Sequence, residues 1–365
     1  MFPKKWTLYS PLFDAIFFFG PFVIVLVFSI VCEFFFPSIL NPASSPLWFF
    51  VFAIFFDVGH VWGTLYRGYL QKNIFKNHAN LLIGVPLLSI GVLIFFSSFT
   101  LPGHEPLYVP LSFLAYFAVF HFMKQQIGFM QLYAKKSEKL GSFEKISKTL
   151  DNTMIWIATG FPFIYWLMNY DILTINWFTP GEFSLLAGFI PQIPFIWILY
   201  ILAILIYSIS QLIFIAEGVR MNPLKYIYLL GTAYVWFNGM VLYDNIIIFG
   251  LGNILLHGIN YYGIIIGSTF KNIESYNEFL QNIKRKGGWM LSIFIIMTLG
   301  ALGFIEEFFW DQFFWQERSI LFSDILYSFG HNHIFLIIVF SLLGSIQLTH
   351  YILDRYIWRG DFGKI

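Results

Sequence analysis

Residues 47–67, LWFFVFAIFFDVGHVWGTLYR, form an apolar stretch that carries four polar side chains at helical spacing. The stretch is long enough to cross a bilayer, since a spanning helix needs about 20 residues. Asp57, His60, Thr64 and Arg67 follow one another at intervals of three, four and three, which predicts one shared helix face. Ionisable side chains are costly in hydrocarbon, so such a face normally points into a helix bundle. We therefore expect a transmembrane helix whose polar face lines a buried site.

Nine further apolar stretches approach the same length. The ten predicted spans are 16–36, 47–67, 80–100, 108–133, 152–169, 194–216, 224–243, 246–269, 289–307 and 333–355. Hydrophobic residues make up 58% of the chain and charged residues only 11%, against roughly 25% charged in soluble domains. The sequence thus predicts an all-α protein, a polytopic transmembrane helix bundle with one membrane domain over residues 1–365.

Lysine and arginine gather in alternate loops between these spans. The loops at 101–106 and 170–193 contain neither, whereas the loop at 134–151 contains five lysines. Basic loops stay in the cytoplasm, so both termini are expected there, in a multi-pass protein of a bacterial inner membrane. Lys225 is counted among these loop residues, and Arg318 is the exception on the outer side.

Composition and motifs exclude several other classes. A net charge of +1 argues against a nucleic-acid partner, because phosphate binding needs a concentrated basic face. The single cysteine, Cys32, rules out an intrachain disulfide and any multi-cysteine metal site. The sequence contains no HExxH protease motif, no GxSxG nucleophile elbow and no Walker loop.

Three other predicted spans each carry one histidine with a polar residue a helical turn away. The pairs are His121 with Gln125, His257 with Asn260, and His350 with Asp354. In the predicted topology these spans and the one bearing His60 run in the same direction. That direction puts His60, His121 and His350 in the cytoplasmic halves and His257 near the middle. Histidines at compatible depths on four helices predict one shared buried site.

Neutral imidazole is a common ligand of transition metals, which makes His60, His121, His257 and His350 the candidate metal ligands. Iron is the favoured metal, zinc and copper are alternatives, and haem is less favoured. The remaining candidate residues would act around the ion. Asp57 and Asp354 would orient or complete the site, Gln125 and Asn260 would supply hydrogen bonds, and Arg67 would hold an anionic head group.

Other ionisable residues are expected to play ordinary structural roles. His78, His104, His331 and His333 are predicted to lie at the surface or near helix ends. Glu306 and Glu307 are expected only to end the ninth span. Any one buried histidine alone could equally bond a backbone carbonyl or a neighbouring helix.

One histidine per helix in a polytopic bundle resembles the Brp/Blh type of bacterial β-carotene dioxygenase. The resemblance rests on the four dispersed histidines and the overall class. It implies a non-haem iron, held by histidines, that cleaves a polyene inside the membrane. We therefore expect a membrane-embedded, metal-dependent oxygenase that takes dioxygen and a membrane lipid or another apolar small molecule.

Two alternatives stay open at this point. The same polar faces would suit a transporter or channel with a proton or metal-ion path. Such a path needs polar residues across the full membrane, but the outward parts at 46–56 and 110–120 are almost wholly apolar. The other alternative is a haem protein with two of these histidines as axial ligands.

Overall fold

The computed structural model describes residues 3–37, 47–100, 107–169, 181–316, 321–322 and 332–358. Within these ranges the regular structure is helical, and the only β-type pairing is one bridge between Glu138 and Arg220. Seven described helices are long and apolar enough to cross a membrane. They are Pro11–Phe35, Trp48–Tyr69, Lys72–Ser97, Ile196–Ala216, Ile246–Lys271, Gly288–Trp315 and His333–Ile357. The chain therefore has the all-helical architecture of a multi-pass membrane protein.

The three remaining predicted spans are helical as well. They correspond to α6 (Tyr108–Ala134), α7 (Glu144–Met168), and α10 (Pro223–Phe237) with its continuation η9 (Asn238–Leu242). The number of spans and the side on which the termini lie stay predictions. The loop at 101–106 with His104, residues 170–180 of the loop at 170–193, Arg318 and His331 lie outside the described residues.

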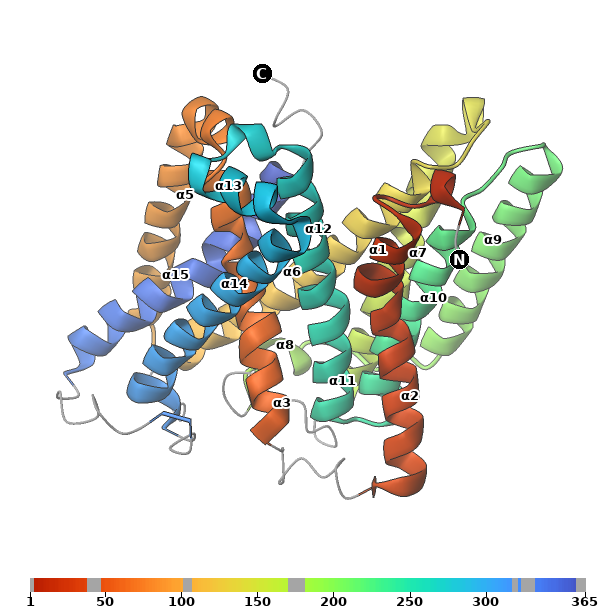
Figure 1. Cartoon of the computed structure of the whole chain (residues 1–365). Helices are drawn as coiled ribbons and strands as arrows, with labels where there is room; N and C mark the ends of the chain where they lie inside the picture. Colours follow the sequence, from red (N-terminus) through yellow and green to blue (C-terminus); the bar gives the residue numbers. More distant parts are fainter. Residues whose placement is uncertain are drawn as a thin grey trace. The chain divides into compact units, whose positions relative to one another are not determined.

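The chain divides into two compact units, and the single membrane domain over residues 1–365 stays a prediction. The first unit comprises Met1–Phe49 and Val119–Asn260. In it, α7 packs against α9 (Ile196–Ala216) and α10, while α2 (Gly20–Phe35) packs against α10 and α11 (Ile246–Asn253) (Figure 1).

Local sequence signals explain where helices of this unit begin and how closely they approach. Asn222 caps α10 by accepting a hydrogen bond from the Leu224 amide, and Pro223 occupies the first helical position. Asn245 caps α11 in the same way. A side chain at Gly231 would collide with the ring of Phe22, so glycine is required where α2 meets α10.

The second unit comprises Phe50–Ala118 and Tyr261–Ile365. In it, α15 (His333–Ile357) packs along α5 (Lys72–Ser97) (Figure 1). Helix α14 (Gly288–Trp310) packs against η5 (Ala53–Val58) and α4 (Gly59–Val61). A Cβ at Gly303 would lie 2.6 Å from the Ile54 carbonyl oxygen and 2.7 Å from the Gly59 nitrogen. The α14 backbone therefore meets the helix that bears His60 directly, without intervening side chains.

Wide π-helical turns interrupt several spans. The segments η5 and η6 (Leu65–Tyr69) flank His60, and η10 (Ile254–Ile259) contains His257. Each such turn inserts a residue into the helical repeat, and π turns are frequent at functional sites. Side chains beyond a π turn consequently point in directions that regular helical spacing does not give.

A fully buried ion pair holds three helices of the first unit together. Lys225 on α10 donates to both carboxylate oxygens of Asp151 on α7, at 3.0 Å each, and to the amide oxygen of Gln211 on α9 at 3.0 Å. The Tyr207 hydroxyl donates to Asp151 at 2.7 Å. The assignment of Lys225 to a basic loop is therefore wrong: its charge is paired inside the protein.

Candidate metal centre

Four histidines form the candidate site, and all four are buried. They are His60, His121, His257 and His350, with 0–4% of their surface exposed. His60 and His350 belong to the second unit, and His121 and His257 belong to the first. Each unit thus contributes two buried imidazoles, and the four residues are a group that could hold a metal ion.

The dimensions and chemistry of the cluster suit a small cation. Metal–imidazole bonds are about 2.0–2.1 Å long, so nitrogens on opposite sides of one ion are roughly 4 Å apart. Ring centroids 4.9 Å apart for His60 and His350, and 5.1 Å apart for His121 and His257, are compatible with two imidazoles of one pair sharing an ion. A set of neutral nitrogen ligands fits iron, zinc, copper or nickel better than the oxygen-preferring calcium or magnesium.

His60 and His350 form one pair within this cluster. Their ring centroids are 4.9 Å apart with the planes nearly perpendicular, at 78°. The ring of Tyr261 packs edge-on against both, at 5.5 Å from His60 and 5.2 Å from His350. The Thr64 hydroxyl lies 2.8 Å from Nδ1 of His350, within hydrogen-bond distance. This contact fixes the ring and leaves Nε2 as the nitrogen that can face an ion.

His121 and His257 form the other pair. Their centroids are 5.1 Å apart and the planes meet at 89°. The Phe122 ring packs edge-on against His257, with the ring centroids 4.4 Å apart, so an apolar ring adjoins this imidazole. These contacts give the second pair the same perpendicular geometry as the first and an apolar surround.

Asn260 and Gln125, which were predicted to supply hydrogen bonds at the site, differ in what they contact. Nδ2 of Asn260 donates to the Tyr228 hydroxyl at 3.1 Å, and that hydroxyl donates to Oε1 of Gln126 at 2.6 Å. This chain of bonds links α12 (Asn260–Lys271), α10 and α6. Gln125 is buried, and neither polar atom of its side-chain amide bonds to a described residue.

The predicted charged residues differ in how close they lie to the imidazoles. Asp57 Oδ1 is 3.9 Å from Nδ1 of His60. Asp354 accepts hydrogen bonds from the Tyr261 hydroxyl at 2.6 Å and the Trp358 indole at 2.7 Å, so it orients Tyr261. Arg67 donates to the Gln71 side chain at 2.7 Å and to the Ile357 carbonyl at 3.2 Å.

Glu306 is a buried polar residue whose position the sequence did not reveal. Its carboxylate accepts hydrogen bonds from Trp62 at 2.8 Å, Gln347 at 2.9 Å and Trp310 at 3.3 Å, and only 1% of the residue is exposed. Helix α14 continues past it, so the expectation that Glu306 merely ends a span is wrong. The sequence signal for a hydrogen-bonded Glu306 was Trp310, an aromatic donor four residues later.

The fold and the histidines together define a class: a multi-pass helical membrane protein with four buried histidines. No family model matches the chain, and neither a curated protein nor a solved structure matches it. The function must therefore be argued from the residues of the site.

Proposed function

We propose that this protein is a membrane-embedded metalloenzyme in which the four histidines hold one transition-metal ion, with iron as the favoured metal. The observation that supports the proposal is a buried, nearly perpendicular pair of imidazoles in each unit, His60 with His350 and His121 with His257. An iron ion held by imidazoles with a position left open can activate dioxygen. The proposed activity is therefore that of a non-haem iron oxygenase.

The surroundings of the imidazoles favour an apolar or lipid-like substrate. Phe122 and Tyr261 present ring surfaces to the histidines, and helices of this kind exclude water from the ion. We propose that the substrate enters from the cytoplasmic side, since basic residues concentrate in the loops assigned to that side.

The number of nearby histidines favours a bare ion over haem. Haem needs two axial ligands on opposite faces of a macrocycle that fills the plane between them. Two of the four buried histidines would then have no role at the iron. A single ion, by contrast, uses all four nitrogens.

Metal exchange and dioxygen uptake test the proposal. The protein purified in detergent is stripped with a chelator and reloaded without oxygen with Fe²⁺ or Zn²⁺. With membrane lipid extract and oxygen, we expect the iron form to consume dioxygen and yield oxygenated lipid products by mass spectrometry, whereas the zinc form does neither. Absence of stoichiometric metal, or metal flux into proteoliposomes without dioxygen uptake, would contradict the proposal.

The contact of Thr64 with His350 gives a second, local prediction. Thr64→Val keeps the side-chain shape but removes the hydroxyl, and loss of such supporting contacts typically weakens metal binding about 10–100-fold. Thr64→Ser should restore affinity to within about threefold of the wild type. The control is Thr298→Val, which removes a hydroxyl bonded within α14. Equal affinities of the Val and Ser variants for Zn²⁺ in a chelator competition would refute this role.

A further inference from the structure

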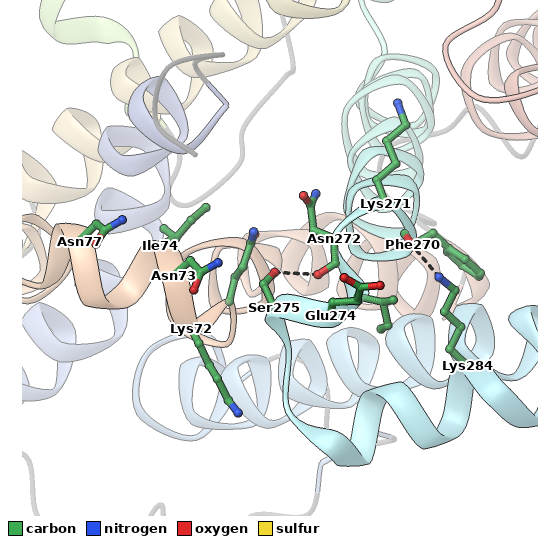
Figure 2. Close-up of a pocket in the computed structure, with 12 residues that line it drawn as sticks. Lys72, Asn73, Ile74, Asn77, Phe270, Lys271, Asn272, Glu274, Ser275 and Lys284 are labelled. Atoms are coloured by element: carbon green, nitrogen blue, oxygen red, sulfur yellow. Dashed lines mark hydrogen bonds between the residues drawn. The ribbon is translucent and has the colours of Figure 1, made fainter. Parts of the chain in front are cut away.

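A polar pocket of about 500 Å³ lies in the second unit, where α5 begins and α12 ends (Figure 2). Its walls come from the first residues of α5, the end of α12, the turn η11 (Ile273–Ser275) and α13 (Glu278–Lys286). Two apolar helices terminate here, Lys72–Ser97 at its start and Ile246–Lys271 at its end. The pocket therefore lies at the depth where a bilayer presents its head groups.

Positive charge predominates around this pocket. Lys72, Lys271 and Lys284 line it together with a single carboxylate, Glu274. Figure 2 shows the side chains of Lys72 and Lys271 pointing in opposite directions, away from each other, while Nζ of Lys284 donates to the Phe270 carbonyl at 2.9 Å. Among the described residues no carboxylate forms an ion pair with Lys72 or Lys284. This excess of cations favours an anionic ligand.

Neutral donors add to the lysines. Gln71 lines the pocket with only 5% of its surface exposed, and its Oε1 accepts a hydrogen bond from Arg67 at 2.7 Å. Oε1 is thereby engaged, and no described residue accepts a hydrogen bond from Nε2 of Gln71, which stays available as a donor. The Asn73 side chain adds a further amide, whereas the Ser275 hydroxyl donates to the Asn272 carbonyl at 2.6 Å and offers the pocket only its oxygen.

The start of α5 carries the polarity that an anion requires. Gln71 precedes the helix without a capping side-chain bond, and the first turn contains no acidic residue. The first amide groups of a helix carry partial positive charge, and an anion is stabilised there. The helix start, the lysines and the buried Gln71 amide therefore all favour a negatively charged ligand.

We propose that this pocket binds a phosphate group, carried by an anionic lipid or by a water-soluble organic phosphate. Donors from the start of α5, the end of α12 and α13 would contact different oxygens of this tetrahedral anion, whereas a planar carboxylate offers only two. The site is separate in its residues from the histidine cluster, and the proposal does not depend on the metal.

Binding measurements with two phosphate sources test the proposal. Glycerol phosphate is titrated by calorimetry into the full chain in a neutral detergent, and retention of phosphatidylglycerol against phosphatidylcholine is followed by native mass spectrometry. We expect saturable binding in one arm, which identifies the source, and a dissociation constant that rises with salt. Absence of saturable binding in both arms would overturn the proposal.

Matched variants assign the binding to the pocket. Lys72→Gln/Lys271→Gln should weaken binding of the active probe by roughly tenfold or more. Lys76→Gln/Lys286→Gln makes the same charge change nearby at positions that do not line the pocket, and should change binding by less than about twofold. Glu274→Gln removes the one carboxylate and should tighten binding roughly threefold. Equal losses in both lysine doubles, or weaker binding in Glu274→Gln, would overturn the proposal.

Discussion

Replacement of any one of the four clustered histidines by alanine should lower affinity for Zn²⁺ by roughly a hundredfold. Four-ligand zinc sites bind with about 10–16 kcal/mol, or roughly 3 kcal/mol for each ligand. Zinc suits the measurement because it has no redox chemistry of its own. Chelator competition on His60→Ala, His121→Ala, His257→Ala and His350→Ala gives the four affinities.

The stoichiometry decides whether the histidines act as one site. If a chelator buffer holds free zinc about tenfold above the wild-type dissociation constant, a single ion held by all four predicts close to one zinc per wild-type chain and roughly a tenth of that in each variant. Two ions, one at each histidine pair, would instead give two zinc ions per wild-type chain and one per chain in each variant. His333→Ala is the control, because His333 lies exposed at the start of α15 and outside the cluster. Loss of zinc from the control would show that these substitutions act through general unfolding.

The sequence predicted the members of the cluster because buried ionisable groups are rare in apolar helices and must be satisfied. It did not predict their contacts. Regular spacing put Asp57, His60, Thr64 and Arg67 on one face, yet Thr64 lies against His350 and Arg67 donates to Gln71. The turns η5 and η6 lie within this segment, and nothing in single-sequence spacing shows where a helix widens.

The hydropathy pattern located the helices correctly but assigned one charged residue, Lys225, to the wrong environment. All ten predicted apolar stretches are helical in the part of the chain that the structure describes. A long apolar segment satisfies its backbone only as a helix, so its structure can be read without its neighbours. Lys225 was misplaced because a charge next to a span looks like a loop cation unless its partner, here Asp151, is known.

The largest effect on folding is expected from breaking that ion pair. Lys225→Met leaves the Asp151 carboxylate buried with the Tyr207 hydroxyl as its remaining side-chain donor. Removing one partner of a buried pair typically lowers the free energy of unfolding by about 3–5 kcal/mol. Unfolding in mixed micelles with rising SDS content measures the change. Lys148→Met, an exposed lysine on α7, is the matched control and should stay within about 0.5 kcal/mol of the wild type.

Removing both charges shows whether the single variant is destabilised by an unpaired buried charge or by loss of the ion pair itself. Asp151→Leu/Lys225→Met leaves no buried charge, but Tyr207 loses its acceptor, so we expect a remaining loss of about 1–3 kcal/mol. Adding Tyr207→Phe removes that hydroxyl and should return stability to within about 1 kcal/mol of the wild type. Gln211 still accepts from Tyr226 at 2.9 Å in every variant. If the double variant were as unstable as Lys225→Met, the ion pair would be contributing net stability, and the cost of an unpaired charge would not explain the single variant.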